Sequence, residues 1–289
     1  MSTAPAARPK PLVLCADDYA QGRGVSQAIR RLAAQGRLSA TSAMVLAPRW
    51  PEEAAALAPL RGQLDVGLHL DWTSAYARAA GHGLGLAAAM ARALLGGFER
   101  SRAREVIERQ LDLFEAHWQA PPDHVDGHQH VQQFAGIREP LVQLLVRRYG
   151  ADRSWLRVSR PAPGQADLKS RTIALMGADA LTKIAADAGV PSAKWLCGIY
   201  DFKGDQAGYA RRMGQWLESA PAGALLMCHP GDSDADSDPD AAPDPIADAR
   251  GHEAAHLGSS AFGAQLARAS VRLVRGSTLY RSAPPAEPR

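Results

Sequence analysis

Leu12-Val-Leu-Cys-Ala-Asp-Asp18 is a short apolar run that ends in two carboxylates. Five consecutive apolar residues suit a strand buried on both faces, and Asp17-Asp18 mark its carboxyl end. A loop containing Gly22 and a helical pattern to about Gln35 follow, with Gly36 as the stop signal. The stretch therefore predicts a strand–loop–helix unit with acidic side chains after the strand.

The same alternation of short apolar strands and helices continues along the chain. Further strands are predicted at residues 41–46, 64–70, 124–130, 155–158, 194–200, 222–228 and 271–274. Helices are predicted at residues 50–60, 86–95, 102–118, 139–149, 168–188, 205–217, 246–257 and 261–269. This order favours a parallel α/β architecture, and a barrel of about seven or eight β/α units fits the length. An open doubly wound parallel sheet is the alternative, because periodicity does not distinguish a closed sheet from an open one.

Composition and charge favour a globular protein and argue against nucleic-acid binding and a membrane helix. The 289 residues are 46% hydrophobic and 22% charged, which is typical of globular proteins. With 33 basic and 30 acidic residues and no basic patch interleaved with aromatics, nucleic-acid binding is not expected. Cys15, Cys197 and Cys228 form no CxxC pair, and no stretch approaches the ~18 apolar residues of a membrane helix. We expect a cytoplasmic protein without a transmembrane segment.

No repeat or linker divides the chain. We expect one domain over residues 11–282, with flexible tails at 1–10 and 283–289. Residues 231–248 are dense in Asp and Pro, which predicts a loop.

His124-Val-Asp-Gly-His-Gln-His130 packs three histidines and a carboxylate into seven residues. In an extended segment His124, Asp126, His128 and His130 would point to one face. Imidazoles beside a carboxylate indicate a metal or acid–base site. The alternative is a polar strand end whose histidines bond backbone carbonyls.

Four predicted strands end in residues of this kind, namely Asp17-Asp18, His69, Asp126 with His128, and His229. In a parallel barrel these ends converge at one mouth. Two histidines and one carboxylate make a metal site that keeps coordination positions open. Because successive side chains of a regular strand diverge, one aspartate would ligate and the other would remain a free base. This division suits metal-assisted hydrolysis, with His229 as the acid.

These motifs carry a family resemblance. Ala16-Asp-Asp-Tyr19, Gly67-Leu-His69, His124–His130 and Met227-Cys-His-Pro230 resemble, in order and spacing, the YdjC/ChbG (ChbG/HpnK) family of carbohydrate deacetylases. The resemblance covers residues 11–282. It implies a deformed β/α barrel that uses one divalent metal ion to remove the acetyl group from an N-acetylated sugar.

The resemblance also implies residue roles. By position in the motifs, Asp18, His69 and His128 correspond to the metal ligands, Asp17 to the general base and His229 to the general acid. Arg250-Gly-His-Glu253 resembles the Arg-x-x-Glu that follows the last long loop of the family and would shape the pocket.

Two positions depart from the family pattern. Tyr19-Ala20 stand where Phe-Gly is frequent, and Gln132 stands where a histidine is common. Neither change removes an expected ligand, but both leave the sugar preference open.

Other polar residues have two interpretations each. Asp126 would orient the imidazole of a metal ligand, or it would be a hydrogen-bonded carboxylate at the strand end. His130 would be a core residue, or it would support a metal ligand. Arg157 and Arg160 would contact an acidic part of the substrate or belong to the charged surface. Ligand softness suits zinc, manganese, cobalt or nickel. Magnesium prefers oxygen ligands but is associated with the family; zinc and magnesium are the first expectations.

The expected substrate is an N-acetylated mono- or oligosaccharide or a glycolipid, and a homodimer is left open. Three alternatives belong to other classes. An iron oxygenase would need a 2-oxo acid, a metal-dependent lyase or aldolase would release an aldehyde or keto acid, and a non-catalytic carbohydrate-binding protein would tolerate loss of Asp17.

Overall fold

The computed structural model describes residues 8–232 and 244–281, and a parallel sheet forms its centre. Eight strands follow the order β6-β5-β4-β3-β2-β1-β8-β7, and β9 pairs with β1 off this path. Every strand pairing among the described residues is parallel. The strands are β1 (Lys10–Tyr19), β2 (Ala40–Ala43), β3 (Asp65–Leu70), β4 (His124–Gly127), β5 (Trp155–Arg157), β6 (Ser192–Ala193), β7 (Leu196–Cys197), β8 (Leu225–Cys228) and β9 (Val271–Leu273).

The two ends of this path meet, so the sheet is a nearly closed barrel. β6 and β7 are consecutive in the chain and lie at opposite ends of the strand order. Pro161, just after β5, forms a parallel bridge with Leu196 of β7. The Leu196 N–H donates to the Arg160 carbonyl at 2.7 Å, and the Ala162 N–H donates to the Leu196 carbonyl at 3.2 Å. The predicted barrel is therefore confirmed, and the open sheet is not.

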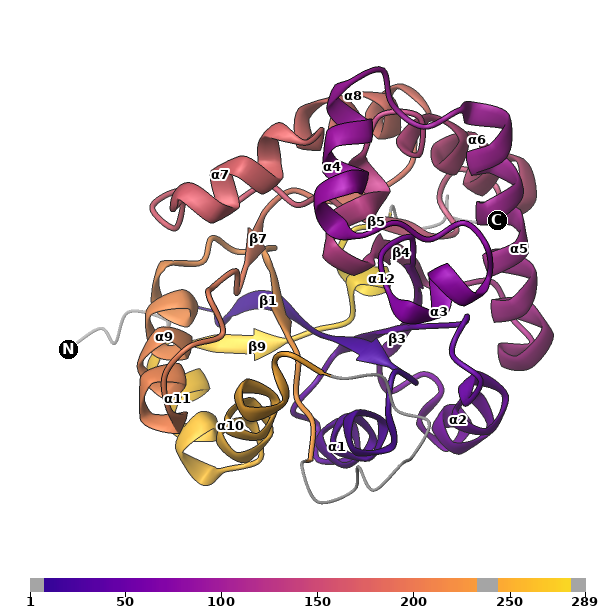
Figure 1. Ribbon diagram of the computed structural model, residues 1–289. Coiled ribbons are helices and arrows are strands. Elements are labelled where there is room, and N and C mark those ends of the chain that lie inside the picture. The colour runs from indigo at the N-terminus through magenta and orange to yellow at the C-terminus, as the bar shows by residue number, and fades with distance from the viewer. Residues whose placement is uncertain (1–7, 233–243, 282–289) are drawn as a thin grey trace, which may run out of the picture.

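Helices surround the strands (Figure 1). They are α1 (Arg23–Ala34), α2 (Trp50–Leu57), α3 (Ala75–Ala79), α4 (Leu86–Leu94), α5 (Arg100–Trp118), α6 (Arg138–Tyr149), α7 (Leu168–Leu175), α8 (Ala178–Asp187), α9 (Gln206–Ser219), α10 (Ala247–Leu257), α11 (Ser260–Arg268) and α12 (Gly276–Leu279), with 3₁₀ segments η1 (Ala58–Leu60) and η2 (His128–Gln133). None of the helices in the described ranges has the length and apolar character needed to cross a bilayer.

The prediction of one helix over residues 168–188 is wrong in one respect, because the structure has two helices there, α7 and α8. Gly177, between α7 and α8, has φ +135°, which L side chains rarely adopt. A Cβ there would lie 2.1 Å from the Gln133 carbonyl oxygen. The break thus lets the chain pass close to η2.

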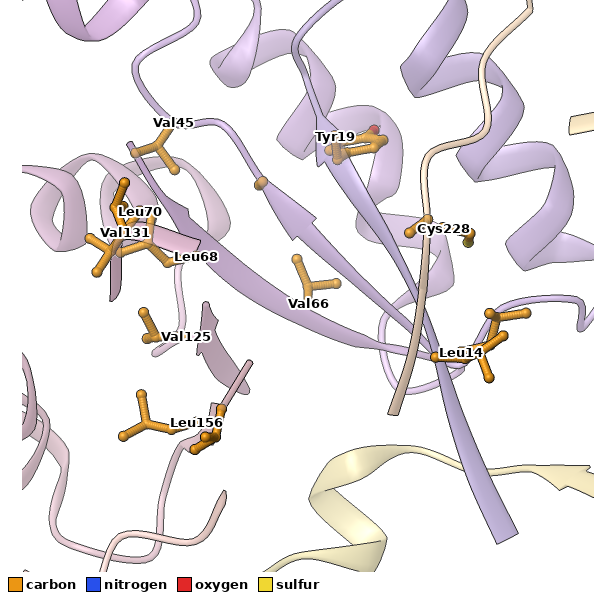
Figure 2. Packing of buried hydrophobic residues seen from close by; sticks show 14 of the residues in the cluster. Leu14, Tyr19, Val45, Val66, Leu68, Leu70, Val125, Val131, Leu156 and Cys228 are labelled. Atoms are coloured by element: carbon orange, nitrogen blue, oxygen red, sulfur yellow. The ribbon is translucent and has the colours of Figure 1, made fainter. Parts of the chain in front are cut away.

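Alternation along β1 separates the two faces of the barrel wall. Leu12, Leu14 and Ala16 belong to the large cluster between strands and helices, part of which Figure 2 shows. Val13 and Cys15 belong to a smaller cluster with Trp155 and Met227 inside the barrel. By the same alternation Asp17 points inward.

The predicted strand over residues 124–130 is too long. β4 ends at Gly127, and Gln129 (φ 53°) and His130 (φ 64°) adopt left-handed conformations within η2. A Cβ on Gly127 would lie 2.8 Å from Gln132 Oε1, so the turn folds tightly back on the strand end. The expectation that four side chains share one strand face therefore holds only for His124 and Asp126.

The tails and the long loop need one correction. Lys10 belongs to β1, with its N–H bonded to the Ser270 carbonyl at 2.8 Å, so the predicted N-terminal tail does not extend to residue 10. Most of the predicted tails, and residues 233–243 of the Asp-rich loop, lie outside the described residues.

Candidate metal centre

Asp18 lies where β1 departs from regular geometry. Its φ is +67°, and the register between β1 and β2 shifts between Ala16 and Tyr19. A bulge of this kind re-aims a side chain. Asp17 and Asp18 both line the cavity at the mouth of the barrel. Adjacent residues of a regular strand could not do this, because their side chains point to opposite faces.

Asp18, His69 and His128 come together at the carboxyl ends of the strands. Asp18 Oδ1 lies 3.0 Å from His128 Nδ1 and 3.4 Å from His69 Nε2. Ligand atoms from all three side chains lie within 4.8 Å of one another. Burial opposes ionisation of Asp18, but Arg250 and the imidazoles hold its pKa well below the ordinary value.

Asp126 orients His69 from the next strand. Its Oδ1 lies 2.7 Å from His69 Nδ1, which leaves Nε2 directed at Asp18. A carboxylate on the far nitrogen of a metal-binding imidazole is a frequent arrangement. The other Asp126 oxygen accepts a hydrogen bond from Ser42 Oγ at 2.8 Å.

Arg157 holds Asp17 from inside the barrel. Its Nη1 lies 2.7 Å from Asp17 Oδ2 and its Nη2 2.5 Å from Asp17 Oδ1, and Nη2 also contacts Asp126 Oδ2. Only 1% of Arg157 is exposed, and it does not line the cavity. Burial opposes ionisation of Asp17, but this guanidinium, together with His69 and His229, outweighs burial and holds the pKa of Asp17 well below the ordinary value. Arg157 therefore faces carboxylates of the protein, so neither the predicted substrate contact nor the alternative of a surface charge holds for it.

His229 follows β8 on the other side of Asp17. Its Nε2 lies 3.8 Å from Asp17 Oδ2, and its ring packs edge-on against Phe202 with centroids 5.1 Å apart. Burial lowers the pKa of His229 to about 4. Its backbone N–H donates to Glu253 Oε2 at 2.6 Å, and burial raises the pKa of Glu253 to about 7.

Arg250 and Glu253 lie one helical turn apart on α10, and Arg250 also lines the cavity onto which the site opens. Arg250 Nη2 donates to Asp18 Oδ2 at 2.7 Å and to Gln21 Oε1 at 3.1 Å. Glu253 also accepts a hydrogen bond from the Tyr200 hydroxyl at 2.6 Å. The predicted Arg-x-x-Glu pair thus contacts Asp18 and the backbone of His229.

The remaining predicted residues lie further out. His130 lines the cavity and its Nδ1 lies 2.9 Å from Ser159 Oγ. Arg160 does not line the cavity and pairs with Asp179 on the surface. His124 is buried inside the barrel, stacked on Trp155 with centroids 4.2 Å apart.

Sequence reasoning missed Ser42, Gln21 and Tyr200. Ser42 also donates to Asp17 Oδ1 at 3.3 Å, so it bridges the two carboxylates beside Arg157. The one available signal was a hydroxyl within a predicted buried strand, and nothing in the sequence marked Gln21 or Tyr200.

A cavity of about 740 Å³ opens onto these groups. Asp17, Asp18, His69, His128 and His229 form its polar end. The rest of its wall is mixed: it includes apolar side chains such as Met90, Phe134 and Ile173, and polar ones such as Arg78, Lys169 and Thr172.

Comparison with known proteins identifies the chain. The YdjC family, described as YdjC-like protein, matches residues 11–268. The chain belongs to the YdjC-like family. A curated relative of this YdjC-like chain, the chitooligosaccharide deacetylase of Serratia marcescens, is 28% identical over 240 residues, which cover 78% of this chain and 83% of the relative.

Solved structures share the fold of this YdjC-like protein. A putative cellobiose-phosphate cleavage protein from Enterococcus faecalis V583 superposes with a TM-score of 0.67 at 17% identity, over 94% of this chain and 99% of the other. The Bc1960 peptidoglycan N-acetylglucosamine deacetylase gives a TM-score of 0.51 at 11% identity, over 94% of this chain and 89% of the other.

The donor set fits a divalent ion. One carboxylate and two imidazoles suit zinc and its neighbours by ligand softness. Two other clusters of the described residues also bring possible ligand atoms together. One consists of Cys15, His124 and Asp126, and the other of Asp17, His69 and Asp126. The Arg157 guanidinium already contacts both, through Asp126 and through Cys15 or Asp17. Asp18, His69 and His128 are therefore the best candidates to hold a metal.

Proposed function

We propose that this YdjC-like protein is a metal-dependent carbohydrate N-deacetylase. The observation that carries the proposal is the pairing of Asp18–His69–His128, which can hold a divalent ion, with Asp17 fixed by Arg157 at the same cavity. The activity named for the Serratia marcescens relative supports the choice of an N-acetylated sugar as substrate.

Asp17 is the proposed general base. Its low pKa keeps the carboxylate ionised throughout the neutral range, which is the form that a general base needs. The bidentate contact with Arg157 fixes both oxygens in place, which reduces the reorganisation needed before proton transfer.

His229 is the proposed acid for the departing amine. Since its pKa is about 4, the imidazole is neutral at pH 7 and must gain a proton before it donates one. Asp17 Oδ2 lies 3.8 Å from His229 Nε2, so the proton that Asp17 removes from water has a short path to the amine.

Asp18, His69 and His128 would hold the ion, whose chemistry when bound is to acidify water and polarise the acetamide carbonyl. Arg250 and Asp126 contribute by fixing Asp18 and His69. The three cysteines are free and buried, which supports the cytoplasm as the proposed compartment.

The test is acetate release from a panel of N-acetylated sugars, with metal-stripped and metal-restored protein compared side by side. We expect Asp17→Asn to lower the rate by about 10² to 10⁴ while it still binds metal. Asp179→Asn, an exposed aspartate outside the cavity, is the matched control and should keep the full rate. Full activity in Asp17→Asn, or failure of the protein to bind any divalent metal, would overturn the mechanism. Release of an aldehyde or keto acid in place of acetate would identify a lyase.

A further inference from the structure

The turn after β4 holds His130 in a strained conformation at the wall of the cavity. Gln129 and His130 both have left-handed φ values, 53° and 64°, which residues other than glycine adopt only at a cost in free energy. Both residues line the cavity, as do Asp17 and His229. Backbone strain of this kind is concentrated at functional sites, yet the proposed mechanism gives His130 no role.

Gln132 fixes the direction of a chain of hydrogen bonds that ends at His130. Its Nε2 lies 3.1 Å from the Arg157 carbonyl oxygen, and because a carbonyl can only accept, the amide nitrogen must face it. The same Nε2 donates to Ser159 Oγ at 3.2 Å. Gln132 is completely buried, and a flipped amide would place two acceptor oxygens against each other. Gln132 therefore acts on Ser159 as a donor.

Ser159 links Gln132 to the imidazole. Its hydroxyl accepts from Gln132 and has a single hydrogen to donate, and its other partner among the described residues is His130 Nδ1 at 2.9 Å. The arrangement that uses this hydrogen has Ser159 donating to Nδ1. An imidazole whose Nδ1 accepts a hydrogen bond carries its own hydrogen on Nε2.

The Nε2–H group of His130 is left for a molecule that enters the cavity. Within the described ranges this nitrogen has no hydrogen-bond partner, and it is not one of the fully buried polar atoms. The proposed mechanism assigns the ion to the acetamide carbonyl, Asp17 to the water and His229 to the amine. The acceptors that remain on an N-acetylated sugar for a further donor are the hydroxyl groups of its ring.

We propose that His130 donates a hydrogen bond from Nε2 to a ring hydroxyl of the sugar, and that Gln132 and Ser159 are positioning residues that keep the hydrogen on this nitrogen. The inference rests on the proposed deacetylase function and adds a determinant of sugar specificity. It also gives a role to Gln132, which stands where a histidine is common in the family. A histidine ring can donate or accept at either nitrogen, whereas an amide held by the Arg157 carbonyl can only donate to Ser159.

The first test locates the hydrogen by ¹⁵N NMR of the full chain labelled at histidine, with zinc and without it. The spectrum of His130→Gln identifies the signals of His130. We expect the hydrogen on Nε2 in the wild type and a mixture of both tautomers in Ser159→Ala. Ser219→Ala, which removes an exposed hydroxyl of α9 outside the cavity, should match the wild type. A hydrogen on Nδ1 in the wild type would overturn the proposal.

The second test compares N-acetylglucosamine with its 3-, 4- and 6-deoxy analogues. In the wild type we expect one analogue to lose about tenfold in kcat/KM, because the imidazole donor is left without its acceptor. In His130→Leu the parent sugar should lose about as much, and the same analogue should lose nothing further. His117→Leu, on the exposed face of α5, should discriminate as the wild type does. Ser159→Ala and His130→Leu should still bind zinc, since neither residue is a proposed ligand.

The same four sugars are compared by calorimetry on zinc-loaded protein, so that the inference does not depend on catalysis. Discrimination in binding that disappears in His130→Leu would support the inference even if no sugar released acetate, and the deacetylase proposal alone would then fail. Equal binding and equal kcat/KM for all four sugars would overturn the inference, while acetate release would leave the deacetylase proposal in place. Discrimination that persisted unchanged in His130→Leu would also overturn it, because another residue would then contact the hydroxyl.

Discussion

At the scale of single residues, charge compensation inside the barrel is the main determinant of the site. Asp17 and Asp126 are both buried, on different strands, and Arg157 contacts each of them. A buried arginine between two carboxylates can be removed only at the cost of leaving their charges without a partner.

Arg157→Met should therefore destabilise the fold by about 3–5 kcal/mol, measured by urea unfolding at pH 7. Without the guanidinium, burial raises the pKa of Asp17, so the acid limb of the activity profile should move to higher pH. Arg157→Lys retains one charge and should lie between the two. Arg160→Met, on a partly exposed neighbour, should change stability by less than about 0.5 kcal/mol. Equal stability of Arg157→Met and wild type would contradict this account.

His124 makes the free energy of unfolding depend on pH. Burial lowers its pKa to about 4 from 6.5, so between these values the unfolded chain binds the extra proton. The free energy of unfolding must fall as the pH decreases through this window, by up to about 1.4 kcal/mol per pH unit. His124→Phe, which keeps an aromatic ring against Trp155, should make the slope measured by urea titrations between pH 4 and 6.5 less steep. His130 and His229, whose pKa values are also lowered by burial, should account for the remaining slope. His117→Gln, on the exposed face of α5, should leave it unchanged.

At the scale of elements, the His124 ring on β4 lies directly against Gly67 on the neighbouring strand β3. A Cβ on Gly67 would lie 2.4 Å from His124 Nε2, so only glycine fits opposite this imidazole. The close approach matters for the site because β3 also carries His69 and β4 carries Asp126.

Gly67→Ala should thus destabilise the protein by about 1–3 kcal/mol through overpacking, as judged by thermal unfolding. The penalty should shrink in a His124→Ala background, and this non-additivity is the specific result. Gly251→Ala, within α10 and with open space around it, should instead stabilise by about 0.5–1 kcal/mol. Strictly additive effects of Gly67→Ala and His124→Ala would show that the two residues do not conflict.

The elements also show what sequence could predict. Apolar runs located the strands and helical periodicity the helices, and the parallel order of the strands predicted that Asp17-Asp18, His69 and His128 converge. The choice of Asp18 as the ligand came from the family resemblance. The bulge at Asp18 and the turn at His130 were not predictable, because left-handed residues other than glycine carry no mark in the sequence. Nor was the contact between Asp17 and Arg157, 140 positions apart, since only closure of the barrel brings them together.

At the scale of the whole molecule, a metal bound only by the folded state would stabilise the entire barrel. Adding zinc to metal-stripped protein at a hundredfold excess over Kd should raise the free energy of unfolding by about 2.7 kcal/mol, seen as a higher Tm. His69→Ala and His128→Ala should lose this response, whereas His117→Ala should keep it. The same rise in Tm in all four proteins would place the ion elsewhere.

The position of β1 in the sheet also determines how long this strand waits for its partner strands during synthesis. β1 leaves the ribosome before the other strands of the described sheet, yet one of its edges pairs with β8 and its beginning pairs with β9. Cys228 Sγ donates to the Cys15 carbonyl across 213 positions, and at 5–20 residues per second that partner arrives about 10 to 40 s later. Until then the nascent chain holds Asp17 and Asp18 on a strand with an open edge, which is a template for pairing with other chains. Chaperone protection during translation would therefore matter more for this protein than for one whose first strand lies at the margin of its sheet.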